Sequence, residues 1–493
     1  MLKALPAARW DYDTAAHLLN RAGFGGPPAV IENLAGLNPD DALSNLLDYE
    51  RHADPTPDPD WAKPDPEGVR QLREAVKNAT PDERRNLNQQ EMRVQNQRLM
   101  ELRGWWLKRM TTGPRPFQEK MVLFWHGHFA TSFEKVRNAY YMWRQNELFR
   151  RLATGNWQEL LTFAGKDPAM LIWLDQADSR RPHANENFAR EVMELFSLGI
   201  GNYTETDVTE GARALTGWSL DRLNQEYVYR PAFHDDGVKT FLGRTGNLNG
   251  DDVIAQIVTH PAAARFITAK LWNYFAGQPP TDELNGALAA VFRENGNNFK
   301  PLLRILFRSE EFYDPAVVRN QVKGPVQWLV GTARVLECAL PPTLICEGIT
   351  RRLGQDLFAP PNVKGWDGGI SWITTTTLLD RYNTAALLVQ GADMPTVRLD
   401  AMQQMTPMAN PPEVQGKRVH IGGVDVNKIL SPDQREDKDR VVAALQHRLL
   451  QSVLKDDQEK ALSDFLNARG KLTDADIRAA IRLVMCTPEY QVT

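Results

Sequence analysis

Residues 185–199, NENFAREVMELFSLG, decide the fold class of this chain. Asn185 is a residue type that caps helix starts, and Gly199 is one that ends helices. At 100° per residue the apolar side chains between them cover one side of a helix. The other side carries a narrow polar stripe of Asn187, Arg190, Glu191 and Glu194. The segment therefore predicts an amphipathic helix, and the same periodicity dominates the rest of the chain.

This periodicity and the scarcity of strand patterns predict an all-α fold. The 493 residues are 42% hydrophobic and 24% charged, which are ordinary globular values that allow a large core. Strand-forming residues flank Asp235-Asp236-Gly237, which predicts a small β-hairpin insertion over 226–243. We expect a large multi-helix domain over 1–395, with a Pro-rich linker loop at 54–68. A linker at 396–439 and a helical C-terminal appendage at 440–493 are expected to follow.

Charge and composition exclude several classes of partner. The 58 Lys and Arg against 62 Asp and Glu give a net charge of −4 without long blocks of one sign, so no nucleic acid partner is expected. Apolar runs are far shorter than the roughly 18 residues of a membrane span. Three scattered cysteines without a Cys-x-x-Cys pair indicate neither a disulfide framework nor a thiolate zinc site. The N-terminus lacks a secretory signal pattern, so a cytoplasmic protein is expected.

The polar stripe of 185–199 has two interpretations. Such a stripe is often a solvated face that carries an Arg–Glu pair. However, an asparagine and two carboxylates aligned on one helix also suit hard metals, sugars and acid–base chemistry. The sequence alone leaves both open.

Residues 119–129, EKMVLFWHGHF, predict a second amphipathic helix, whose end is set by Gly127. His126 and His128 would diverge by about 200° on a continuous helix, so they can face one point only if the backbone changes at Gly127. A His-x-His pair of this kind is a common metal-ligand device. The alternative is that His126 caps a helix end and His128 forms a hydrogen bond in the core.

His234 and Asp235 lie at the predicted hairpin turn. Aspartate is common in turns, but a histidine ring beside a carboxylate can also have its tautomer fixed or complete a metal shell. The chain has no G-x-S-x-G, Walker, G-x-G-x-x-G or H-E-x-x-H motif. The commonest hydrolase, NTPase, dinucleotide and metalloprotease signatures are thereby excluded.

A set of ordered motifs resembles the bacterial family known as domain of unknown function 1800. The motifs are HLLNRAGFG (17–25), FWHGHFATS (124–132), NENFARE and MELFSLG (185–199), YTETDVTEGARALTGW (203–218), FHDDGVKTFLG (233–243), RFITAKLW (265–272) and PPNVKGWDGG (360–369). The resemblance spans roughly residues 10 to 390 and leaves the C-terminal 100 residues outside. It implies a predominantly helical protein, often accompanied by a sulfatase-like companion, and several members carry export signals. The family's polar positions match here as His126, His128, Asn187, Arg190, Glu191, Glu194, His234, Asp235 and Asn362.

Three functional hypotheses follow. In the first, an enzyme holds a divalent metal through His126, His128, Glu191, His234 and Asp235, with Glu194 as base and Arg190 and Asn187 binding substrate, for hydrolytic or oxidative chemistry. In the second, a metal-free enzyme acts on a polysaccharide: Asn187 and Arg190 orient a sugar or neutralise a uronate, and a histidine is the base. In the third, the protein is a non-catalytic chaperone or partner of the sulfatase-like companion.

Overall fold

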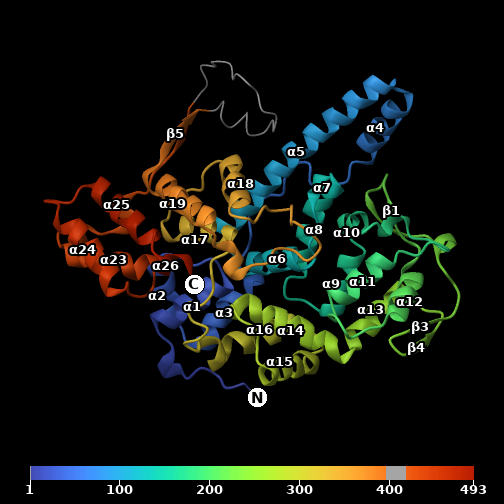
Figure 1. Ribbon diagram of the computed structural model, residues 1–493, viewed down its shortest axis with the longest axis horizontal. Coiled ribbons are helices and arrows are strands. Elements are labelled where there is room, and N and C mark those ends of the chain that lie inside the picture. Colours follow the sequence, from blue (N-terminus) through green and yellow to red (C-terminus); the bar gives the residue numbers. More distant parts are fainter. Residues whose placement is uncertain (1, 396–417) are drawn as a thin grey trace.

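The computed structural model describes residues 2–395 and 418–493, and most of them lie in helices (Figure 1). Three two-stranded antiparallel sheets are the only sheets within these ranges, so the prediction of an all-α fold with a small β insertion is confirmed. None of the helices described combines the length and apolarity needed to cross a membrane. The chain begins with α1 (Tyr12–Ala22), α2 (Pro28–Ala35), α3 (Pro39–Leu47), α4 (Pro66–Asn78) and α5 (Pro81–Thr112).

Helix α6 (Pro116–His128) lies at the centre of the helical body. Nearly all of its residues are buried, because α5, α3 and α8 (Ala139–Arg151) pack around it. The sequence predicted an amphipathic helix that ends at Gly127, but α6 continues through Gly127 to His128. Gly127 is instead a point of close packing: a Cβ atom on Gly365 would lie 2.3 Å from the Gly127 carbonyl oxygen.

Helices α4 and α5 form an arm that projects from this body (Figure 1). Helix α5 starts at a capping box, in which Thr80 and Glu83 bond each other's backbone N–H groups. Helix α4 has no buried residue. The Pro-rich segment that precedes it was predicted to be a linker loop, and it lies along α5: the Trp105 indole N–H donates to the Pro57 carbonyl (2.9 Å) and that of Trp61 donates to Glu101 (2.7 Å).

The polar-stripe helix α11 (Glu186–Glu194) begins as predicted, with the Asn185 side chain accepting a hydrogen bond from the Phe188 N–H group. Its regular part ends at Glu194, and looser turns carry the chain to Gly199. Helix α12 (Glu205–Leu215) packs against it in the opposite direction, because Arg190 contacts Glu205 while Glu186 contacts Thr209. The other helices of this body are α7 (Phe133–Val136), α9 (Trp157–Gly165), α10 (Pro168–Trp173), α13 (Gly250–Thr259), α14 (Pro261–Ala276), α15 (Asp282–Glu294), α16 (Phe299–Arg308), α17 (Pro325–Val335), α18 (Thr343–Arg352) and α19 (Thr375–Gln390).

The predicted β-hairpin over 226–243 is replaced by two adjacent hairpins. Strand β2 (Glu226–Tyr229) pairs with β1 (Trp218–Asp221), and β3 (Lys239–Phe241) pairs with β4 (Arg244–Gly246). Leu242 and Gly243 have φ values of 45° and 81°, which is the backbone that a two-residue hairpin turn requires. The expected pairing across Asp235-Asp236-Gly237 is therefore wrong. That turn connects the two hairpins, and Pro231 interrupts the segment that would have extended the first strand.

The C-terminal unit is joined closely to the helical body. It contains α23 (Lys438–Leu449), α24 (Asp456–Asn467), α25 (Asp474–Met485) and α26 (Pro488–Gln491), and α25 packs on α19. Arg21 of α1 donates to the Thr493 carbonyl at 2.7 Å. Of the predicted linker at 396–439, residues 396–417 lie outside the described residues, and the rest forms β6 (Arg418–Ile421), α21 (Val426–Ile429) and α22 (Pro432–Arg435). Strand β6 pairs with β5 (Ala392–Pro395).

Candidate functional site

Two of the three predicted groups of site residues meet where α6 and α11 end. The His128 Nε2 atom lies 3.0 Å from the Phe196 carbonyl oxygen, just beyond α11. Lys270 of α14 donates to the Leu195 carbonyl (2.9 Å) at the same place. The 360–369 loop covers the other side of the α6 end, where the Trp366 ring packs on His126 with a centroid separation of 5.5 Å. The His-x-His pair, the polar stripe and this loop therefore share one junction.

His126 is built into the core of this junction. Its Nε2 atom accepts a hydrogen bond from the Phe358 N–H group (3.0 Å), and its ring packs against Trp106 and Phe358. Burial lowers the pKa of His126 to about 3, so the ring is neutral at physiological pH. Since Nε2 uses its lone pair on Phe358, Nδ1 carries the proton. In this arrangement His126 has no free lone pair for a metal ion.

His128 faces away from His126, as expected for positions i and i+2 of a continuous helix. Its Nε2 group donates to Phe196, which leaves the Nδ1 lone pair directed at the Lys270 ammonium group 3.4 Å away. Burial and the charge of Lys270 hold the pKa of His128 well below its usual value. Both ring nitrogens are therefore engaged with protein groups. Burial also lowers the pKa of Lys270, to about 8.

Lys270 is a residue of this junction that sequence reasoning did not single out. It belongs to the motif RFITAKLW, where a single lysine follows an otherwise mainly apolar helical stretch. A lysine at a buried helix position needs a partner, and the carbonyl groups at the end of α11 provide one. A lysine within the largely apolar stretch FITAKLW was the feature that could have identified it.

His234 and Asp235 lie at the opposite end of the α11–α12 pair. His234 Nδ1 bonds the Thr216 carbonyl (2.9 Å) at the C-terminal end of α12, beside the start of α11. Asp235 forms an ion pair with Arg213 (2.9 Å), and this contact lowers the pKa of Asp235 to about 2. The nine residues of α11, roughly 13 Å of helix, separate these groups from the His128 end. The expected convergence of the three rings is not observed, and the described residues contain no group of three His, Cys, Asp or Glu placed to hold a metal ion.

The outer part of the polar stripe is accessible to solvent. Asn187 is exposed, and Arg190 forms a two-pronged ion pair with Glu205 of α12, with both contacts at 2.7 Å. An Arg–Glu pair was one of the two interpretations of this stripe. The carboxylate that Arg190 binds, however, comes from the neighbouring helix, so Glu191 and Glu194 are not used in this pair.

Glu191 and Glu194 form the inner part of the stripe, and both are half-buried. Glu194 accepts a hydrogen bond from the Tyr203 hydroxyl at 2.7 Å. The Glu191 carboxylate has no hydrogen bond or ion pair with any residue in the described part of the chain. Burial and the neighbouring Glu194 charge raise the pKa of Glu191, and Lys364 of the 360–369 loop partly opposes this rise. The junction thus contains two adjacent carboxylates in different environments.

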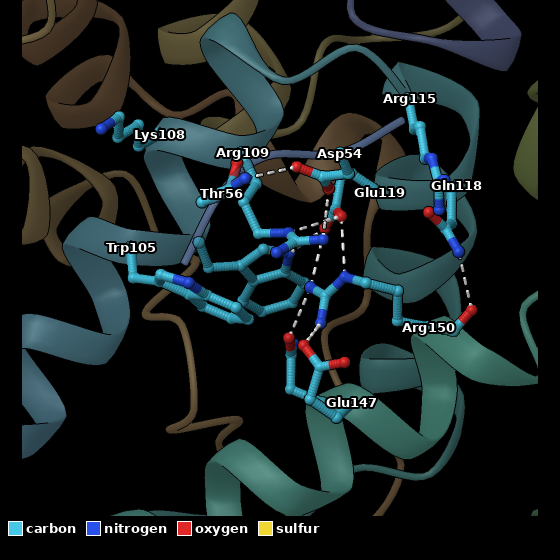
Figure 2. Close-up of polar contacts among 12 residues, drawn as sticks. Asp54, Thr56, Trp105, Lys108, Arg109, Arg115, Gln118, Glu119, Glu147 and Arg150 are labelled. Atoms are coloured by element: carbon cyan, nitrogen blue, oxygen red, sulfur yellow. Dashed lines mark hydrogen bonds and ion pairs between the residues drawn. The ribbon is translucent and has the colours of Figure 1, made fainter. Parts of the chain in front are cut away.

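A buried cluster of charges in the helical core was not predicted from the sequence. Glu119 of α6 binds Arg109 of α5 (3.1 Å) and Arg150 of α8 (2.8 Å), and Figure 2 shows these three side chains converging. Glu119 also accepts a hydrogen bond from the Trp106 indole N–H group (2.9 Å). Each guanidinium group lies 4.8 Å from the centre of the Trp105 ring. Arg109 also pairs with Asp54, and Arg150 with Glu147. We call these residues the Glu119 network, and its buried charges compensate one another.

Comparison with known proteins identifies the family of the chain but no activity. A family model described as a protein of unknown function (DUF1800) matches residues 17–492. The match includes the C-terminal unit, which the sequence motifs had left outside, and the close packing of that unit on α19 agrees with this wider extent. No curated protein and no solved structure matches. The chain therefore belongs to the DUF1800 family of proteins of unknown function.

Proposed function

We propose that this protein is an enzyme that performs acid–base chemistry on a carbohydrate through Glu191 and Glu194. The observation that carries the proposal is the state of Glu191, a half-buried carboxylate beside a second carboxylate and without a protein partner among the described residues. A fold has no structural use for such a group, because burying an uncompensated charge costs stability. Acid–base enzymes, in contrast, use carboxylates whose pKa is raised toward neutral pH.

The two carboxylates would have different roles. Glu191, with its raised pKa, is suited to give a proton to a substrate or take one from it. Glu194 is held in place by Tyr203, so it can orient the substrate or stabilise positive charge that develops beside it. Residues three apart on a helix have Cβ atoms about 5–6 Å apart, so one sugar unit could contact both.

The surroundings of the pair favour a substrate with hydroxyl or carboxylate groups. Asn187 presents an amide one helical turn before Glu191, and Lys364 brings a positive charge to it from the opposite loop. Arg190 lies beside them at the surface. Amide and cationic donors around an acid–base pair suit a polysaccharide that contains uronates. In this proposal the histidines of α6 support the junction and do not contact substrate.

The proposal is tested with Glu191→Gln, which keeps the size of the side chain and removes its charge. The matched control is Glu186→Gln, an exposed carboxylate on the same helix. We expect the wild type and the control to depolymerise a member of a panel of uronate-containing polysaccharides, and Glu191→Gln to lose on the order of 100-fold or more of kcat. Equal activity of Glu191→Gln and wild type would contradict the proposal.

A metal assay separates the proposal from the other two hypotheses. Activity that survives chelation agrees with metal-free chemistry, whereas loss on chelation and recovery with one divalent ion would favour the metal enzyme. A folded protein that is inactive on the whole panel and binds a sulfatase-like companion would favour the non-catalytic role.

A further inference from the structure

A second candidate site lies in a cleft at the N-terminal end of α6, opposite the end that carries His128. The cleft has a volume of about 610 Å³, within the range typical of small-molecule sites. Helices α1, α2 and α3, the turn between α5 and α6, and α17 all contribute to its walls. None of its lining residues belongs to α11, α12 or the 360–369 loop, so it is separate from the proposed acid–base site.

The polar part of the cleft is positively charged. Arg115 and Arg334 line it together with His52, and no aspartate or glutamate lines it. Arg115 uses its Nε group on the His52 carbonyl (2.6 Å), and its two Nη groups have no partner among the described residues. Arg334 donates to the Gly25 and Thr111 carbonyls, both at 2.9 Å, and forms no ion pair with a described residue. Asp54 is near enough for Arg115 to help lower its pKa, but its ion pair is with Arg109. Two guanidinium groups therefore face one cavity, and neither forms an ion pair with a described carboxylate.

An uncompensated cation in a partly closed site is costly, and this cost points to an anionic ligand. Burial lowers the pKa of Arg334, which indicates how poorly its charge is solvated. The nearby carboxylates of Asp48 and Glu50 are occupied elsewhere, because they pair with Lys300. Guanidinium groups bind carboxylates and phosphates through paired hydrogen bonds, so a ligand oxyanion would fill this role.

The rest of the cleft is apolar. Val30, Leu34 and Leu37 line it, and Val30 and Leu37 are 40% and 38% exposed, unusually high for large hydrophobic side chains. A ligand with an aliphatic part would cover these side chains and remove their apolar surface from water. The cleft thus combines a cationic part with an apolar wall.

We propose that this cleft binds a small amphiphile with an acidic head group. Arg115 and Arg334 contact its carboxylate or phosphate, and Val30, Leu34 and Leu37 contact its aliphatic chain. The site is independent of the acid–base chemistry proposed at Glu191.

Calorimetric titration of the full-length protein with octanoate, octyl phosphate and octanol tests the proposal. We expect at least one of the two anions to bind, and octanol, which has the same chain without the charge, to bind at least tenfold more weakly. The stronger of the two anions identifies the head group. Arg115→Gln should weaken anion binding at least tenfold, because it removes one of the two cations. The control is Arg51→Gln, an exposed arginine that pairs with Asp48 and does not line the cleft.

A second variant guards against a folding defect. Leu37→Asp places a negative charge on the exposed apolar wall, so it should weaken anion binding without disturbing the contacts of Arg334. Thermal melts of each variant confirm that it is folded. The proposal is overturned if neither anion binds at millimolar concentration, if octanol binds as tightly as the anions, or if folded Arg115→Gln and Leu37→Asp both bind like wild type. Glu191→Gln should bind the anions normally, so failure of the acid–base proposal leaves this test unaffected.

Discussion

The Glu119 network and the Glu191–Glu194 pair show two ways in which a helix of this protein carries a carboxylate. Glu119 is 1% exposed and receives hydrogen bonds from two arginines and a tryptophan. Glu191 is half-buried and has no such partner in the described part of the chain. Burial alone would raise the pKa of Glu119, but Arg150 and Arg109 outweigh it and hold that pKa below its usual value. At Glu191 burial and the adjacent Glu194 raise the pKa instead.

This difference in partners distinguishes a structural carboxylate from a candidate catalytic carboxylate better than residue type does. Both segments combine charged and apolar residues in their sequences, and both carry glutamates at helical spacing. What distinguishes them is whether cations from other elements reach the carboxylate. A buried charge that is fully compensated supports the fold, whereas a partly buried charge that lacks a protein partner is available for a ligand.

The largest expected effect comes from breaking the Glu119 network. Glu119→Gln removes the charge that Arg109 and Arg150 share, and we expect the free energy of unfolding to fall by about 3–5 kcal/mol. Urea unfolding followed by circular dichroism measures this loss. Glu147→Gln is the control, because Glu147 also pairs with Arg150 but its side chain is 32% exposed. A loss below about 1 kcal/mol for Glu119→Gln would show that the network does not hold the core together.

A smaller effect is expected from His126, which lies at the junction with Glu191 but is bonded like a core residue. His126→Phe keeps an aromatic ring and leaves the Phe358 N–H group without its acceptor, so the free energy of unfolding should fall by about 1–3 kcal/mol. If this variant instead lost activity while keeping wild-type stability, His126 would belong to the candidate site and not to the core.

The same residue gives a pH test. The pKa of His126 is lowered to about 3, so between pH 6.5 and 3 the unfolded chain binds a proton at this position that the folded protein does not. The free energy of unfolding therefore decreases as pH falls through this window. The slope of the free energy of unfolding against pH should be less steep in His126→Phe than in wild type. The difference should correspond to the uptake of up to one proton on unfolding. An unchanged slope would mean that His126 is protonated in the folded protein.

Local sequence patterns were enough to predict the helices but not their partners. The capping box at Thr80 and the Asn185 cap mark helix starts that the structure contains, because such caps act over three or four residues. The Glu119 network joins residues from Asp54 to Arg150, and no periodicity within one helix reveals contacts over that range. The strand pairing at 226–243 failed for a similar reason, since the turn at Leu242-Gly243 competes with the one at Asp235-Asp236-Gly237.

The candidate site was predicted in part. The polar stripe and the His-x-His segment do meet, as a site would require, but the two histidines point in opposite directions because α6 continues through Gly127. Their spacing on a helix was known from the sequence, whereas the continuation of that helix through Gly127, where the 360–369 loop packs closely, was not. His234 could not be placed from the sequence, because its position depends on which strands pair.

The smallest expected change in stability is the most informative about Glu191. Because its folded-state pKa is raised above the usual glutamate value, the ionised form costs stability, and the free energy of unfolding decreases as pH rises through that raised pKa. Glu191→Gln removes this cost, so above that pH it should unfold with a free energy equal to wild type or higher by less than about 1 kcal/mol. Thermal melts of both proteins from pH 4 to pH 8 measure the difference, which should grow in favour of the variant as pH increases.

Glu194→Gln is the matched control: it alters the Tyr203 hydrogen bond and should cost about 0.5–1.5 kcal/mol. If Glu191→Gln instead lost 3 kcal/mol or more, Glu191 would have a compensating partner as Glu119 does, and the distinction between the two carboxylates would fail.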